Sequence, residues 1–202
     1  MMGLPIRNII VATNENEVLH DLIQHGVYRR KKTALTNSPS MDIDAASNSE
    51  RPLFDLFERD PVKIRQFMET FSRTGSVSLA DVGMGHLSLR SLGFDSGVSN
   101  NLQRVQTIRT AYEVYNDIID PHTAAALHVT LERPKPEIPT IIMETASQVK
   151  FEDTTAEAIG RENVPERQER FRNIERYLQN EFAYVALRDE EELKDFIRAH
   201  RR

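Results

Sequence analysis

The segment Pro139–Phe151 reads PTIIMETASQVKF, and it decides the expected fold. Its apolar run Ile141–Met143 is typical of a central parallel strand, which is buried on both faces. The run ends at Glu144–Ser147, whose small and polar side chains favour neither a buried strand nor a helix. Ligands of open α/β sheets bind beyond the carboxyl ends of the strands. Thr145 is therefore the first candidate for a ligand contact. The alternative is an ordinary strand-to-loop exit in which Thr145 makes only a local hydrogen bond.

A second apolar stretch shows the same pattern near the start of the chain. The residues Ile6–Thr13 read IRNIIVAT and predict a buried strand rich in β-branched side chains. Asn14–Asn16 then ends the strand, and Asn16 is placed to cap a helix that runs to Gly26. Two buried strands with polar exits indicate a parallel sheet.

Helical patterns account for most of the remaining chain. We predict helices beginning at the caps Ser47 or Asn48, Asp60 and Asp120, a helix over Val105–Ile119, and later helices over Thr154–Gly160, after Val164–Pro165 and after Asp189. Tyr184–Leu187 is compatible with a short strand or a helical turn. Tyr28–Ser47 is a long loop, either functional or a surface linker, and Ser76–Asn101 is a flexible connection.

The expected fold class is α/β, a partial parallel sheet flanked by helices with a helix-rich carboxyl-terminal part. We divide the chain into residues 1–150, an α/β region, and residues 151–202, a helical region. His122, in the first turn of its helix, is expected to be a partly buried polar residue and not a catalytic one.

Composition excludes several classes of function. The 202 residues carry a net charge of −5, so nucleic acid or an acidic membrane has no electrostatic support as a partner. No apolar run is long enough for a membrane helix. The chain has no cysteine, which excludes disulfides and favours the reducing cytoplasm. Its histidines lie too far apart for a compact metal-binding motif, so we predict no metal site.

Five groups of residues follow the order and spacing of one known family. They are MGLPIRNIIVATNEN (2–16), SPSMDI (38–43) with SNSER (47–51), RTAYEVY (109–115) with IIDPHTA (118–124), PTIIMETA (139–146), and KF (150–151). Over residues 2 to 160 the chain resembles the carboxyl-terminal portion of bacterial threonine synthase, a pyridoxal-phosphate lyase of fold type II. The last forty residues are not distinctive.

The resemblance implies a cofactor, a small-molecule substrate and one site residue. The family converts O-phosphohomoserine and water to threonine and phosphate with pyridoxal 5'-phosphate. Thr145 occupies the position whose hydroxyl is expected to donate a hydrogen bond to the pyridine nitrogen, a role that suits a neutral group facing an unprotonated ring nitrogen.

Other parts of the family's machinery have no counterpart in the matched segments. The Schiff-base lysine and the glycine-rich loop that binds the cofactor phosphate lie upstream of them in the family. We therefore assign no catalytic residue to this chain and expect it to be inactive alone. None of its lysines is expected to form the Schiff base: Lys31, Lys32, Lys63, Lys135, Lys150 and Lys194.

The sequence also departs from the family pattern. The family's His-Pro-Ala after the threonine and alanine is Ser147-Gln148-Val149 here, which removes a rigid proline and an imidazole beside the cofactor. Glu17 replaces the usual aspartate. The matched loops also contain four polar residues for which the sequence suggests no role: Asn14, Asn16, Ser40 and Asp42.

Three interpretations remain open at this point. In the first, the chain is an incomplete piece of a pyridoxal-phosphate lyase, either a truncated gene product or one part of a split enzyme with a complementary amino-terminal chain. Alternatively, it is a non-catalytic remnant that binds a partner, and its unpaired strand edge leads us to expect self-association. An ordinary α/β ligand-binding domain would explain the strand exits but not the ordered matches.

Overall fold

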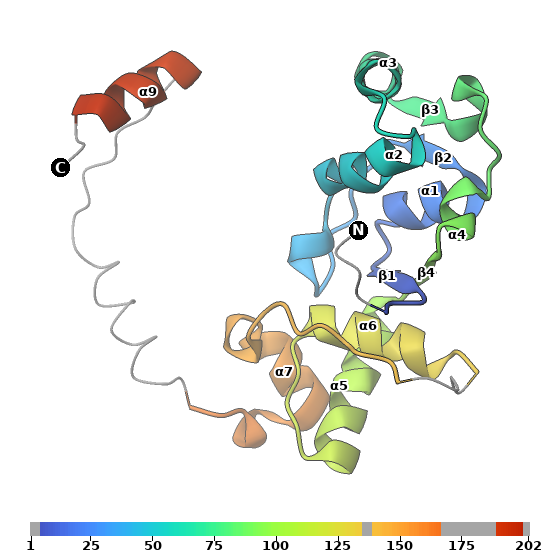
Figure 1. Ribbon diagram of the computed structural model, residues 1–202. Coiled ribbons are helices and arrows are strands. Elements are labelled where there is room, and N and C mark those ends of the chain that lie inside the picture. Colours follow the sequence, from blue (N-terminus) through green and yellow to red (C-terminus); the bar gives the residue numbers. More distant parts are fainter. Residues whose placement is uncertain (1–4, 135–138, 167–188, 200–202) are drawn as a thin grey trace. The chain divides into compact units, whose positions relative to one another are not determined.

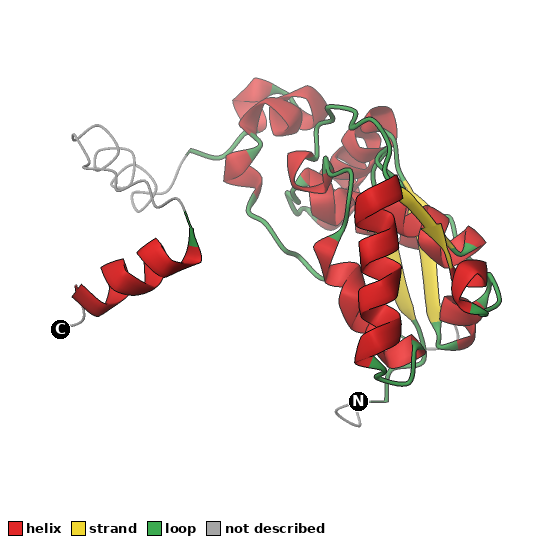
Figure 2. Cartoon of the chain, turned by 90° about the horizontal axis from the view of Figure 1, so that it is seen from above, coloured by secondary structure: helices red, strands yellow, loops and turns green. Residues whose placement is uncertain are grey.

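The computed structural model describes residues 5–134, 139–166 and 189–199 (Figure 1). Helices predominate over strands among them (Figure 2). The chain forms two compact units, Met1–Val164 and Pro165–Arg202. In the described ranges no helix is long and apolar enough to cross a membrane.

A parallel pair of strands lies at the centre of the first unit. β1 (Ile9–Thr13) pairs with β4 (Phe94–Val98), with Thr13 opposite Val98 at the carboxyl ends. Helix α1 (Val18–His25) and helix α6 (Pro121–Leu131) pack on this pair, from opposite sides (Figure 1). The expected α/β class, a small parallel sheet flanked by helices, is confirmed.

β4 lies in a region for which the prediction was wrong. Ser76–Asn101 is not a flexible connection, because it contains β3 (Ser76–Ser78), the 3-10 helix η3 (Leu79–Val82), α4 (Ser88–Ser91) and β4. The polar residues of β4 obscured it in the sequence. Asp95 accepts a hydrogen bond from Gln24 of α1 at 2.9 Å and forms an ion pair with Arg133 after α6. Because Gln24 and Arg133 provide partners for Asp95, the strand can contain polar side chains.

The predicted strand at Ile141–Met143 is the second correction. Residues 139–145 have no regular secondary structure, and the side chains of Ile141 and Met143 are 83% and 70% exposed. A strand needs a hydrogen-bonding neighbour as well as β-branched residues. Among the described residues no strand runs beside this segment, so local propensity alone does not form one.

The main core is built by an antiparallel pair of strands, by α1 and by two further helices. β2 (Val27–Arg29) pairs with β3, and α2 (Glu50–Leu56) and α3 (Pro61–Thr74) pack nearby. The predicted start and end of α3 are confirmed: Asp60 caps it, and Gly75 ends it in the left-handed conformation. Tyr28, expected in a loop, lies in β2 and is fully buried against Phe71 at 4.3 Å between ring centroids.

A second cluster joins α5 (Asn101–Tyr115), α6 and α7 (Glu152–Ile159). α5 ends four residues earlier than predicted, because Asn116 adopts the left-handed conformation. The predicted caps give a mixed result. Asp120 caps α6 as expected, whereas Asn16 does not cap α1, whose N-cap is Glu17.

Short 3-10 helices occupy several connections of the first unit: η1 (Pro39–Met41), η2 (Ser47–Ser49), η4 (Gln148–Lys150) and η5 (Arg161–Asn163). In the second unit, α9 (Glu190–Ala199) follows Asp189, whose carboxylate accepts the backbone N–H groups of Glu191 and Glu192 at 3.0 Å, as predicted. The predictions for Phe171–Leu178 and Tyr184–Leu187 lie outside the described residues.

Candidate functional site

Polar side chains gather where β1 ends. Asn14, the first residue beyond the strand, is fully buried, and its side-chain amide donates to Asp42 Oδ1 at 2.7 Å and to Thr36 Oγ1 at 2.8 Å. Asn16 donates to the same Asp42 oxygen at 3.0 Å and to the Ala34 carbonyl at 2.9 Å. We call residues 34–42 the anchored loop. It belongs to the stretch Tyr28–Ser47, which was predicted as a long loop, either functional or a surface linker, and these hydrogen bonds tie it to the strand exit.

Arg104 holds the anchored loop from a second side. This fully buried side chain donates from Nε to Asn37 Oδ1 at 2.6 Å. Its Nη1 donates to the carbonyl and hydroxyl of Ser99, and its Nη2 donates to Glu15 Oε2 at 2.8 Å and Asn101 Oδ1 at 2.5 Å. All five guanidinium N–H groups are therefore used inside the protein. Arg104 joins both strand exits and has no donor left for an anion.

His122 holds the anchored loop from a third side. The backbone N–H of Ser40 donates to His122 Nε2 at 3.1 Å, and His122 Nδ1 lies 2.7 Å from Asp120 Oδ1. The other Asp120 oxygen accepts the Thr123 hydroxyl, and Oδ1 also accepts the backbone N–H of His122 at 2.8 Å. Asp120 is fully buried and His122 is 9% exposed. His122 was expected to be partly buried, and the structure buries it almost completely.

The electrostatics of Asp120 follow from these contacts. Burial by itself raises the pKa of a carboxyl group, but the hydrogen bonds from His122 and Thr123 outweigh it and hold the pKa of Asp120 below its ordinary value of 3.8. Asp120 is thus a buried carboxylate whose charge is balanced by hydrogen-bond donors at the start of α6.

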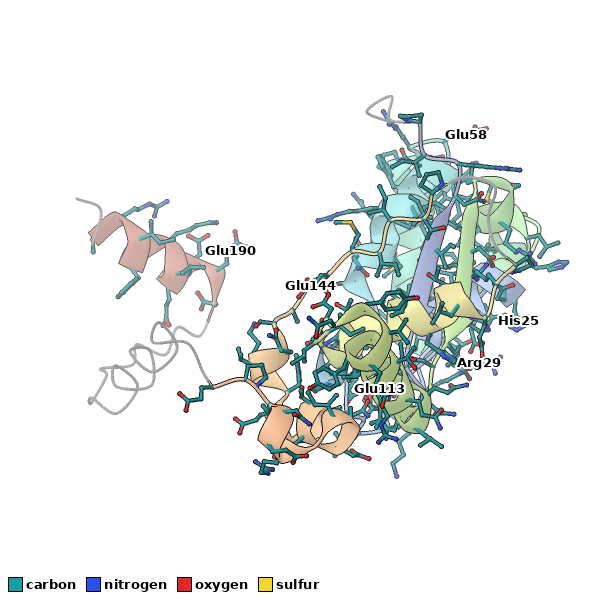
Figure 3. All side chains as sticks on the ribbon, turned by 90° about the horizontal axis from the view of Figure 1, so that it is seen from below. His25, Arg29, Glu58, Glu113, Glu144 and Glu190 are labelled. Carbon is teal, nitrogen blue, oxygen red and sulfur yellow. The ribbon has the colours of Figure 1, made fainter. Side chains whose placement is uncertain are left out.

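Thr145 lies in a different environment. It belongs to the stretch between α6 and α7, here called the connecting segment (residues 139–151). Thr145 is exposed, and so is its neighbour Glu144, which Figure 3 labels. The Thr145 hydroxyl makes no hydrogen bond to another described residue. The connecting segment ends at Phe151, whose ring packs edge-on against His122 with 4.8 Å between the centroids. The alternative of Thr145 as a local hydrogen-bonder has no support here.

The structure thus separates the residues that the sequence singled out. Asn14, Asn16 and Asp42 meet in one network, and the backbone of Ser40 joins it to α6. The sequence did not suggest Arg104, because an arginine in an amphipathic helix is usually solvated. The Asp-x-His spacing at the start of α6 was the one available signal for the Asp120–His122 pair.

Comparisons with known proteins agree on one family. The family model for the carboxyl-terminal domain of threonine synthase matches residues 123–197. The threonine synthase of Methylobacillus glycogenes is 44% identical over 178 residues, which is 87% of this chain and 37% of the relative. That of Corynebacterium glutamicum is 45% identical over 177 residues, covering 86% of this chain and 36% of the relative.

A solved structure gives the same result. The crystal structure of threonine synthase from Brucella melitensis with bound pyridoxal phosphate superimposes with a TM-score of 0.78 at 29% identity, over 100% of this chain and 42% of that one. The chain therefore has the fold of the carboxyl-terminal portion of a pyridoxal-phosphate enzyme of the α/β class. More particularly, it is related to the carboxyl-terminal portion of the bacterial threonine synthases, and it spans a little over a third of the relatives it matches.

Proposed function

We propose that this chain is the carboxyl-terminal portion of a threonine synthase, the lyase that converts O-phosphohomoserine and water to threonine and phosphate in amino-acid biosynthesis. The observation that carries the proposal is the 44% identity to the Methylobacillus enzyme over 87% of the chain. It is supported by the packing of the matched loops, because Asn14, Asp42 and Asp120 all contribute to holding the anchored loop at the strand exits. We place the protein in the cytoplasm, because the chain has no cysteine and proteins of this reducing compartment do not depend on disulfides.

Thr145 is the residue that we assign to the cofactor. Its exposed hydroxyl, with no hydrogen bond to another described residue, is able to donate to an unprotonated pyridine nitrogen. The donor chemistry of this segment therefore fits one edge of pyridoxal phosphate, a cofactor that acts as an electron sink for bonds at the substrate's α-carbon.

The lysines of this chain do not complete the site. A Schiff-base lysine must reach its neutral form, and burial or nearby positive charge normally assists this. Lys31 is in the opposite situation: burial lowers its pKa, but the carboxylates of Asp21 and Glu17 outweigh that effect and raise the pKa above 10.5. On α9, hydrogen bonds to Glu190 and Glu191 likewise raise the pKa of Lys194. We propose that the chain is inactive unless another segment supplies the amine and the phosphate-binding loop.

Reconstitution tests this proposal. The chain is mixed with the amino-terminal portion of the Methylobacillus enzyme and pyridoxal phosphate, and cofactor absorbance is followed through gel filtration. We expect absorbance to co-elute with the pair and with neither part alone. A pair that forms but carries no cofactor would count heavily against the assignment.

Thr145 variants provide the matched control in the same assay. Thr145→Val removes the hydroxyl but keeps the shape, and we expect it to weaken cofactor binding by about tenfold, the effect of one lost hydrogen bond. Thr145→Ser keeps the hydroxyl and should bind within about twofold of the parent. Equal binding by both variants would remove Thr145 from the site while leaving the family assignment intact.

A non-catalytic, partner-binding role is the second candidate. The exposed side chains of Ile141 and Met143 favour it, since apolar side chains in an extended segment suit a protein partner. The departure at Ser147–Val149 also fits a site that no longer needs the family's imidazole. In the reconstitution assay this role predicts a stable pair without cofactor and without release of phosphate.

A further inference from the structure

His122 lies between two segments that approach α6 from different parts of the chain. Its Nε2 accepts the backbone N–H of Ser40 in the anchored loop, and its ring packs against Phe151 at the end of the connecting segment. These contacts bridge 82 residues of sequence on one side and span the connection to α7 on the other. One side chain therefore contacts both the loop held at the strand exits and the segment that carries Thr145.

The hydrogen bonds fix the protonation of the His122 ring. The N–H of Ser40 can only donate, so Nε2 must present its lone pair at 3.1 Å. The single proton of the neutral imidazole is then on Nδ1, where it is donated to Asp120 Oδ1 at 2.7 Å. Asp120 is held in turn by Thr123 and by the backbone N–H of His122. The ring cannot rotate without breaking both bonds.

The same geometry removes His122 from the chemistry. Each ring nitrogen is engaged by a protein group, and only 9% of the residue is exposed. A general base needs a lone pair within reach of substrate, and this lone pair is already used. The role left for His122 is to orient the two segments that it contacts, the anchored loop and the connecting segment.

We propose that His122 is a positioning residue that couples the anchored loop to the connecting segment and thereby sets the place of Thr145. The coupling itself depends only on contacts within this chain. Its consequence for the cofactor rests on the function proposed above. A change at His122 should loosen both segments together, although they are far apart in the sequence.

Two amide substitutions separate the two hydrogen bonds of the ring. In His122→Gln the side-chain oxygen reaches the place of Nε2 and can still accept from Ser40. In His122→Asn the shorter amide reaches only the place of Nδ1, so the bond to Asp120 remains possible and that to Ser40 is lost. Both variants carry a side-chain amide, but the glutamine side chain is one methylene longer than the asparagine side chain. His128→Gln, on the same helix, is the control, because His128 Nε2 lies 3.3 Å from Glu132 of that helix.

Hydrogen exchange of the full chain without cofactor gives the first readout. We expect His122→Asn to accelerate exchange of the Ser40 amide by about tenfold, the effect of one lost hydrogen bond. It should also accelerate exchange of the Lys150 and Phe151 amides, which are hydrogen-bonded to the carbonyls of Ser147 and Gln148. His122→Gln should restore protection of Ser40, and His128→Gln should change neither segment. Unchanged exchange of the Lys150 and Phe151 amides in His122→Asn would overturn the coupling.

A variant on the other side of the ring covers the case in which His122→Asn does not fold. Phe151→Leu keeps an apolar side chain but removes the ring contact with His122. It should accelerate exchange of the Lys150 and Phe151 amides and also that of the Ser40 amide. Protection of Ser40 equal to the parent would overturn the coupling.

Reconstitution separates this inference from the proposed function. If the parent chain binds no cofactor with its complement but the exchange pattern is as expected, the function fails and the coupling stands. If cofactor binds and His122→Asn changes neither the cofactor affinity nor the exchange of the Lys150 and Phe151 amides, the coupling fails and the function stands.

Discussion

At the scale of single residues, buried polar groups determine the conformation of the anchored loop. Asn14, Arg104 and Asp120 are each fully buried, and each has its polar atoms matched by partners. An unmatched buried polar group costs about 1–3 kcal/mol, so each of these residues is tied to the position of its partners. The loop therefore has one favourable conformation although little of it is regular secondary structure.

Asp120 gives this network a pH dependence. We expect Asp120→Asn to lower the free energy of unfolding near neutral pH by about 1–2 kcal/mol, because its charge-assisted hydrogen bonds to His122 and Thr123 are lost. The pKa of Asp120 is lowered in the folded state, so its contribution is complete above the ordinary value of 3.8 and disappears as the pH falls through the folded-state pKa. Urea unfolding of both proteins between pH 7 and pH 2 measures this difference. A difference that grew on acidification would contradict the assignment.

At the scale of elements, α6 packs closely against β4 because Gly97 of β4 has no side chain. A Cβ atom at Gly97 would lie 2.5 Å from Cγ1 of Val129, closer than real contacts allow. We expect Gly97→Ala to destabilise the first unit by about 1–3 kcal/mol through overpacking. The double variant Gly97→Ala, Val129→Ala should recover part of this loss, because the second change removes the clashing methyl groups. Thermal unfolding of the two single variants and the double variant measures the coupling between the positions.

The same element explains what the sequence could and could not predict. Helix starts such as Asp60 and Asp120 were predictable, because a cap and a following proline act locally. β4 was missed because Asp95 and Ser96 are matched by side chains of α1 and of the residues after α6, which only the fold brings near. Ile141–Met143 was predicted as a strand because propensity does not reveal whether a neighbouring strand is present.

The candidate site was predictable to a similar extent. Polar exits from strands pointed to Asn14, Asn16 and Thr145, and the resemblance gave Thr145 a role. The sequence did not indicate that Arg104 and His122 hold the same loop, since those contacts join residues more than sixty positions apart. The roles of Arg104 and His122 can be recognised only from the fold, which brings the strand exits and the helices together.

At the scale of the whole molecule, exposed apolar groups predict association. Among the described residues β1 has a partner strand on one side only, and the side chains of Ile141 and Met143 are 83% and 70% exposed. We expect the isolated chain to self-associate. Ile141→Lys with Met143→Lys should reduce the association, whereas Leu102→Lys, at another exposed apolar position, should not. Light scattering over a concentration series measures this, and a clean monomer of the parent chain would contradict it.

The three-sided hold on the anchored loop has a consequence for biosynthesis. The ribosome adds His122 82 residues after Ser40. The hydrogen bond from the Ser40 N–H to His122 cannot form until that histidine has left the exit tunnel. Residues 34–42 on the growing chain lack the Arg104 contact until residue 104 has emerged, and they lack the His122 contact for longer still. The loop can therefore reach its final conformation only after the start of α6 has been translated.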